Sequence, residues 1–134
     1  MRTIRFKGKS IENGEWLYGD LVRNVEGTFA IVPPFEIDLN NHCERYEVDE
    51  DTIGQFTGNY DRNGKEIFDG DILCYGTNSE YTCSVEWSNK INTFCIKCAY
   101  SEILLSEFIR FMDGVEVIGN VHNNQNLIKG GKDE

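Results

Sequence analysis

Two aspartates follow glycine at matching places in the chain, in Gly19-Asp20 and Gly70-Asp71. Two carboxylates held close together can act as a general acid and a general base, as they do in many hydrolases. An aspartate after glycine at the start of a strand also commonly accepts hydrogen bonds from nearby backbone in a turn. We therefore interpret Asp20 and Asp71 as structural, and keep a carboxylate-based hydrolase as the least favoured function.

One pair of the five cysteines has the spacing of metal ligands, Cys95-Ile-Lys-Cys98. A structural zinc site needs a second such pair, and the sequence offers only single cysteines and the distant His42 and His122. The pair also lies in a strand-like run, residues 93–99, where residues three apart point to opposite faces. We expect buried, reduced thiols, with no bound metal and no cofactor.

Other motifs that could carry chemistry are missing from the sequence. The densest acidic run, residues 47–51, lacks the glycine and the ligand spacing of a calcium loop, so we interpret it as a solvated turn. The chain has no glycine-rich phosphate-binding loop, and neither histidine lies in a nucleophile or metal motif. We therefore name no catalytic, cofactor-binding or metal-binding residue.

The charge and composition exclude several classes of protein. A net charge of −10 with scattered lysines and arginines disfavours binding to a nucleic-acid backbone, so nucleic acid is not an expected partner. Apolar runs are too short to span a bilayer, and no apolar stretch follows the first five residues as it would in a signal peptide. The sequence predicts a globular protein that stays in the cytoplasm where it is made and does not contact a membrane.

Most of the chain has the pattern of β-strands. Apolar and polar residues alternate in short runs, and Asn13-Gly14 and Asn63-Gly64 provide residues that tolerate positive φ in tight turns. The one helical pattern spans residues 102–112, where apolar residues form a single face. Ser101 can cap this helix and Asp113-Gly114 can end it.

The chain repeats its own pattern. Residues 12–22 and 62–74 both run from Asn-Gly to Gly-Asp and a pair of aliphatic residues, and the halves close on Ile53-Gly54 and Ile118-Gly119. Two copies are too few for a solenoid. Strongly bent strands with glycine at the bends suit two small SH3-like units. We therefore predict a mainly β, compact, barrel-type fold.

The repeat also predicts how the chain is divided. Residues 1–60 form the first β unit, and residues 61–128 form the second, which contains the helix. Residues 129–134 are expected to be a disordered tail. These boundaries rest on the two copies of the pattern and on the polar, glycine-containing end of the chain.

These residues resemble the YopX protein family of phages and prophages. The resemblance covers almost the whole chain and is carried by residues 4–10, 13–22, 54–58, 61–72 and 115–121. It implies a compact, mainly β protein encoded by a phage or an integrated mobile element, and often self-associating. It implies no catalytic or ligand-binding residue. The cysteine content, and a segment at 123–128 without the family's proline, depart from the pattern.

From these features and the resemblance we predict a phage- or prophage-encoded accessory protein in the cytoplasm of the bacterial host, which acts by binding a host or phage protein rather than by catalysis. The alternative is a nucleic-acid-binding module that uses an SH3-like face. We also expect a homo-oligomer, because small β units leave strand edges open and the apolar content is high for two thin units. The competing possibility is a monomer whose helix covers the exposed edge.

Overall fold

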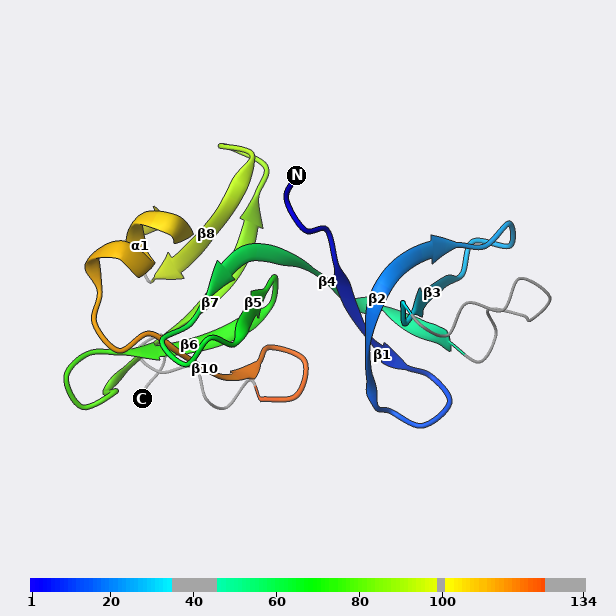
Figure 1. The fold of residues 1–134 in the computed structure, drawn as a ribbon, viewed down its shortest axis with the longest axis horizontal. Coiled ribbons are helices and arrows are strands. Elements are labelled where there is room, and N and C mark those ends of the chain that lie inside the picture. Colours follow the sequence, from blue (N-terminus) through cyan, green and yellow to red (C-terminus); the bar gives the residue numbers. More distant parts are fainter. Residues whose placement is uncertain (35–45, 99–100, 125–134) are drawn as a thin grey trace. The chain divides into compact units, whose positions relative to one another are not determined.

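The computed structural model describes residues 1–34, 46–98 and 101–124 (Figure 1). The contacts within the chain divide it into two compact units, Met1–Phe56 and Thr57–Glu134, which we call unit 1 and unit 2. Both are built from antiparallel strands, and the described residues contain a single short helix. The prediction of a mainly β fold is confirmed. The division predicted from the repeat, after residue 60, falls at the end of the strand that passes from unit 1 into unit 2.

The four strands of unit 1 form a ring that is closed by four strand pairings. Its strands are β1 (Phe6–Ser10), β2 (Trp16–Arg23), β3 (Phe29–Val32) and β4 (Glu47–Tyr60). Each strand pairs with the next, and β1 also pairs with β4. Ala30, Ile31 and Val48 are buried in this unit. A bulge interrupts the last pairing, because the partner in β4 changes from Gly54 to Asp49 between Lys7 and Lys9.

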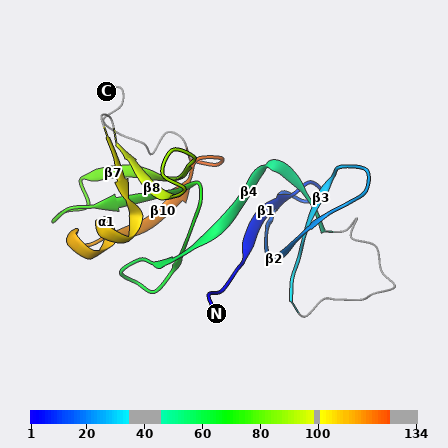
Figure 2. The ribbon, with the colours of Figure 1, turned by 90° about the horizontal axis from the view of Figure 1, so that it is seen from above.

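Unit 2 is a five-stranded antiparallel sheet with one helix packed against it. The elements are β5 (Glu66–Phe68), β6 (Asp71–Tyr75), β7 (Tyr81–Ser88), β8 (Thr93–Cys98), β9 (Ser101–Leu104), α1 (Leu105–Phe111) and β10 (Glu116–Asn120). The strand order is β10-β6-β7-β8-β9, so β10 and β9 are the edges, while β5 pairs with the end of β4. Figure 2 shows α1 beside β8, and the two elements are in contact.

The core of unit 2 lies between the sheet and α1. Cys83 and Val85, two residues apart on β7, point to the same face of the sheet and are buried. Leu105 and Phe108, three residues apart on α1, cover that face. The Tyr75 ring packs edge-on against Phe108, with ring centroids 4.9 Å apart. No helix in the described residues is long and apolar enough to cross a membrane.

The helix begins later than the sequence predicts. Residues 101–104 form β9, where Ile103 pairs with Ile96 and Glu102 with Lys97 of β8. This pairing overrides a local pattern that suited a helix over residues 102–112. The residue before the helix is Leu104, whose side chain makes no capping hydrogen bond. The predicted start at residue 102, with Ser101 as cap, is therefore wrong.

The two predicted Asn-Gly turns are present. Gly14 and Gly64 adopt φ values of 74° and 80°, a region that favours glycine. A buried side-chain oxygen stabilises each turn. In the first turn, the hydroxyl of Ser10 accepts a hydrogen bond from the backbone N–H of Glu12, at 3.1 Å. In the second turn, the acceptor is the carboxylate of Asp61.

The strand pairings of the repeated segments differ between the two units. In unit 2, the strand after Gly70 pairs directly with the Ile-Gly strand, because Gly119 faces Ile72. In unit 1, β2 lies between β1 and β3, and Gly54 pairs with β1 instead. Gly70 has a positive φ of 93°, whereas Gly19 does not have a positive φ and lies against β3. A Cβ at Gly19 would collide with the carbonyl oxygen of Val32.

Candidate functional site

The two Gly-Asp aspartates occupy different environments. Asp71, in unit 2, is only 2% exposed, and its Oδ2 accepts a hydrogen bond of 2.8 Å from the backbone N–H of Phe68. It thereby closes the turn between β5 and β6. Asp20, in unit 1, lies exposed on β2. These different surroundings favour a structural role for Asp71, and leave Asp20 as a surface carboxylate.

The described thiols are buried. Cys74, Cys83 and Cys95 are free cysteines inside unit 2. Burial and the negative charge of Glu102 raise the pKa of the Cys95 thiol, although a hydrogen bond with Ser88 acts in the opposite direction. A thiol with a raised pKa is protonated at neutral pH, so Cys95 is a poor nucleophile and a poor metal ligand.

The remaining candidates from the sequence do not form a metal centre in the described residues. No three side chains of His, Cys, Asp or Glu in this part of the chain are grouped so that they could hold an ion. His42, Cys43 and the side chain of Cys98 lie outside the described residues. The acidic residues 49–51 are exposed, as predicted, but they belong to the bulge in β4 and not to a separate turn.

In unit 2, the carboxylate of Asp61 accepts three backbone hydrogen bonds. Its Oδ1 accepts backbone N–H bonds from Asn63 and Lys65, at 2.8 and 2.9 Å. Its Oδ2 accepts one from Val117, at 3.0 Å, which ties the turn to the start of β10. Burial by itself would raise the pKa of Asp61, but these three hydrogen bonds and the nearby charge of Lys65 outweigh it and lower the pKa.

This environment indicates a structural role for Asp61. A carboxylate with a lowered pKa, whose oxygens both accept backbone hydrogen bonds, stays ionised and is poorly suited to carry a proton. The sequence reasoning did not single out Asp61. The available signal was its place just before Asn63-Gly64, where aspartate commonly accepts turn N–H bonds.

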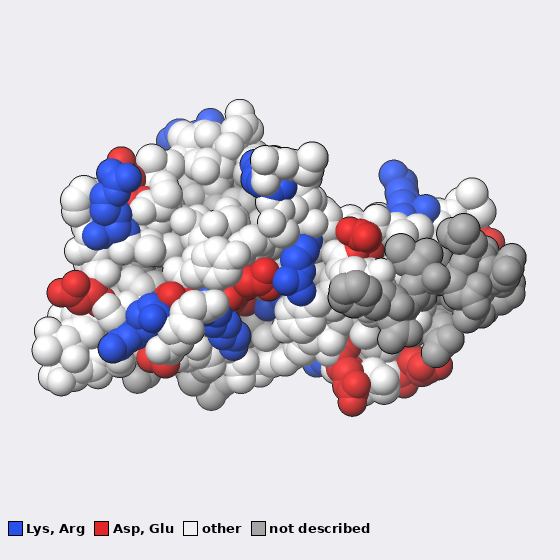
Figure 3. Space-filling view, in the orientation of Figure 1, with Lys and Arg blue, Asp and Glu red and all other residues white. Residues whose placement is uncertain are grey.

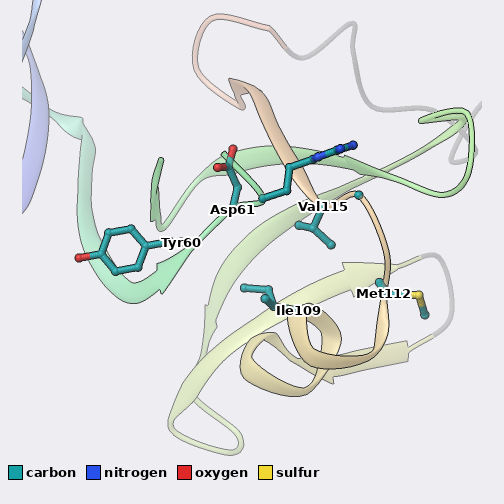
Figure 4. A pocket seen from close by; sticks show the side chains of 7 residues that line it. Tyr60, Asp61, Ile109, Met112 and Val115 are labelled. Atoms are coloured by element: carbon teal, nitrogen blue, oxygen red, sulfur yellow. The ribbon is translucent and has the colours of Figure 1, made fainter. Parts of the chain in front are cut away.

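A small hollow lies beside this turn, at the C-terminal end of α1. Its volume is about 130 Å³, and it is lined by Tyr60, Asp61, Arg62, Ile109, Met112, Gly114 and Val115. In Figure 4 the carboxylate of Asp61 points away from Ile109 and Met112, as its hydrogen bonds require. The lining thus combines the apolar Ile109 and Met112, at the end of α1, with the charged residues Asp61 and Arg62. This space is about large enough for one apolar side chain.

Two exposed apolar side chains line the hollow, and a third is next to one of them in the chain. Tyr60 is 50% exposed, Met112 is 41% exposed, and Phe111, the last residue of α1, is 72% exposed. We call these three residues, together with the half-buried Ile109 of the hollow, the α1-end surface. Large apolar side chains grouped on a surface commonly mark an interaction site.

Basic side chains do not gather into a patch on the face that Figure 3 shows. Blue and red side chains are interspersed over the described residues. In unit 1, Lys7 is buried, and its Nζ lies 4.9 Å from the centroid of the Trp16 ring. A nucleic-acid interface needs exposed cations along the path of the backbone, and the face in Figure 3 shows no such row of cations among its described residues.

The fold defines a small, mainly β protein with two units and no recognisable catalytic centre in its described residues. The model of the family described as YopX protein matches residues 5–129, and the chain therefore belongs to the YopX family. The expected resemblance is confirmed over nearly the whole chain. No curated protein matches the chain.

A solved structure has a similar fold. It is the crystal structure of protein EF1440 from Enterococcus faecalis, which is 24% identical in sequence. The match covers 96% of this chain and 100% of that chain, with a TM-score of 0.58. At this identity, the likeness shows the fold and gives no activity.

Proposed function

We propose that this protein acts by binding another polypeptide and not by catalysis, as an accessory protein of a phage or prophage in the bacterial cytoplasm. The observation that carries this proposal is the α1-end surface. Tyr60 and Met112 line the hollow and are exposed there, and the exposed Phe111 precedes Met112 in the chain. Apolar and aromatic side chains of this kind supply most of the binding energy at protein interfaces.

The polar groups of unit 2 support a binding role. The carboxylates of Asp61 and Asp71 accept hydrogen bonds from backbone N–H groups, and the Cys95 thiol has a raised pKa. Each of these groups therefore has a structural environment that suits neither acid–base nor nucleophilic catalysis. The nucleic-acid alternative has less support, because the net charge and the mixed charges on the face in Figure 3 are unfavourable to it.

A capture experiment with matched variants tests the proposal. Tagged wild-type protein, Phe111→Ser and Ile91→Ser would be used to capture partners from lysogenic or infected cells. Ile91 is a suitable control because it is also an exposed apolar residue of unit 2, outside the α1-end surface. We expect a partner, either another protein or untagged copies of this chain, that is retained by wild type and Ile91→Ser and lost by Phe111→Ser.

Two results would contradict the proposal. Capture of no polypeptide at all would remove the basis for a binding role. Equal capture by Phe111→Ser and Ile91→Ser would exclude the α1-end surface. Retention of the wild-type protein on single-stranded or double-stranded DNA at low salt would favour the nucleic-acid alternative.

A further inference from the structure

We infer that Asn13 is a site of spontaneous deamidation, and that a hydrogen bond to Glu116 protects Asn63 from the same reaction. The two Asn-Gly pairs of the chain are alike in sequence and lie in exposed turns. Asparagine is among the chemically labile residues of proteins. The structure gives the two side-chain amides different hydrogen-bond partners, and this difference decides which of them reacts.

Deamidation of an Asn-Gly pair is an attack of the backbone on the preceding side chain. The glycine nitrogen forms a bond to Cγ of the asparagine and loses its proton, which ends on the side-chain nitrogen as that nitrogen leaves as ammonia. The product is a cyclic succinimide. Water then opens the ring and leaves aspartate or isoaspartate in place of the asparagine. Glycine favours the attack because it has no side chain to obstruct it.

The side chain of Asn13 is polarised for this attack. Its Oδ1 accepts a hydrogen bond of 2.9 Å from the backbone N–H of Glu15. This bond draws electron density toward the oxygen, and it would stabilise the negative charge that develops there when the glycine nitrogen attacks Cγ. Within the described residues, the side-chain nitrogen of Asn13 makes no hydrogen bond, so its departure as ammonia breaks no contact in this part of the chain.

The turn that contains Asn13 is held by local contacts. The Gly14 nitrogen must be released before it can react, because its N–H donates to the carbonyl of Ser10 at 2.9 Å. The backbone N–H of Asn13 donates to the hydroxyl of the same serine over a longer distance, 3.4 Å. These bonds, and the one from Glu15, stay within residues 10–15. Exposed turns that are held by such local bonds open at a low cost in free energy.

Asn63 is tied to a distant part of unit 2. Its Nδ2 donates a hydrogen bond of 3.0 Å to Oε2 of Glu116, at the start of β10. Its backbone N–H donates to Asp61, whose carboxylate also binds the backbone of Val117. Loss of the side-chain nitrogen as ammonia breaks the bond to Glu116. The carboxylate also places electron density on the amide, which makes Cγ less electrophilic.

The attacking nitrogens of the two sites have matching surroundings. The N–H of Gly64 donates to the carbonyl of Asp61 at 3.0 Å, close to the 2.9 Å bond of Gly14. Nothing lies within 4 Å of a Cβ placed on either glycine, so neither is shielded by packing. The sites therefore differ in the side-chain amide and its partner. We expect the bond to Glu116 to slow the reaction at Asn63 about tenfold, the effect of one hydrogen bond to a charged group.

Deamidation at Asn13 changes the turn that joins β1 to β2. Either product adds a negative charge between Glu12 and Glu15. Isoaspartate also adds a carbon atom to the backbone of the turn, next to the pairing of Lys9 with Trp16. We therefore expect the stored protein to accumulate a more acidic form with a less stable unit 1.

Peptide mapping by mass spectrometry measures both sites in one sample. The full-length protein is held in mildly alkaline buffer, and samples taken over several days are digested with chymotrypsin. This protease cleaves after Phe, Tyr and Trp, so it releases residues 7–16 and 61–68 as fragments with one asparagine each. Conversion of the amide to an acid raises the mass of the fragment. We expect fragment 7–16 to convert at least about tenfold faster than fragment 61–68.

An unfolded sample and two variants separate the effect of structure from that of sequence. In urea, the two fragments should convert at similar rates. Glu116→Ala should speed the conversion of Asn63 about tenfold and leave the rate at Asn13 unchanged. Glu107→Ala is the matched control, since it removes an exposed glutamate of unit 2 that is not bonded to Asn63, and it should change neither rate. Thermal melting confirms that both variants are folded.

Several results would overturn the inference. Equal conversion of the two fragments in the native protein excludes the protection of Asn63. A fragment 7–16 that converts in urea and stays unchanged in the native protein excludes Asn13 as a site. A difference between the fragments that persists in urea means that neighbouring residues in the sequence set the rates. A folded Glu116→Ala protein in which Asn63 converts as slowly as in wild type excludes the role of Glu116.

Discussion

Removing the Asp61 carboxylate should destabilise unit 2 strongly and in a pH-dependent way. The change is Asp61→Ala, which leaves three backbone N–H groups without their acceptor. A hydrogen bond to a charged group contributes about 1.5–3 kcal/mol, and a buried donor left unsatisfied costs about 1–3 kcal/mol. The three contributions are not additive, because water can reach the exposed side of the turn. We therefore expect a loss of about 3–5 kcal/mol in the free energy of unfolding at pH 7.

The pH dependence follows from the lowered pKa of Asp61. Its unfolded-state pKa is close to 3.8, the ordinary value of an aspartate, and its folded-state pKa is lower. The carboxylate therefore contributes its full stabilisation above the unfolded-state value, and this contribution is lost as the pH falls toward the folded-state value. The difference between wild type and Asp61→Ala should shrink as the pH is lowered from 7 to 3.

Urea unfolding followed by tryptophan fluorescence measures this difference. Trp87 reports on unit 2, and Trp16 in unit 1 is replaced by Phe in all proteins compared. Asp20→Ala is the matched control, since it removes an exposed carboxylate and should change stability by less than about 0.5 kcal/mol. An Asp61→Ala protein as stable as wild type at pH 7, or a difference that is constant down to pH 3, would refute the reasoning.

Further predictions concern the glycines, the second buried carboxylate and a thiol. Gly19→Ala should lower the free energy of unfolding in urea by about 3 kcal/mol, because the added Cβ collides with the backbone of Val32. Gly14→Ala should lower it by only about 1 kcal/mol, because the cost there is that of a positive φ without a collision. Equal losses would contradict the close approach at Gly19. Asp71→Ala should cost about 2 kcal/mol through its lost hydrogen bond to backbone, and Asp20→Ala almost nothing, so similar values for both would mean that the two Gly-Asp pairs are equivalent. With the other four cysteines replaced by serine, Cys95 should react with a thiol reagent only when urea unfolds the chain, and rapid labelling of the native protein at pH 7 would show that the thiol is accessible.

Local features of the fold could be predicted from the sequence. Asn13-Gly14 and Asn63-Gly64 form the expected turns because their conformation depends on a few neighbouring residues and on the freedom of glycine at positive φ. The β-rich character follows from alternation and aromatic content. The resemblance to the YopX family was a more specific basis for prediction than the composition, since it rests on particular runs of residues.

Features that depend on distant residues could not be predicted in this way. Residues 102–104 have a helical pattern, but β8 offers them a pairing partner that no local pattern reveals. The role of Asp61 depends on Val117, which is far away in the sequence. The hollow likewise combines Arg62 with Gly114, and only the fold brings them together. Two carboxylates that look alike in sequence, Asp20 and Asp71, differ in burial because their strands have different neighbours.

The ring of pairings in unit 1 has a consequence for the order of events during synthesis. β1, near the start of the chain, pairs with β4 at residues 48–55, and β2 and β3 lie between them in the sequence. The ring therefore cannot close until β4 has left the ribosome, and such distant pairings form slowly. The sheet of unit 2 is completed later still, because β10, which pairs with β6, is translated near the end of the chain. We expect unit 1 to close while much of unit 2 is still being translated, as N-terminal units generally do.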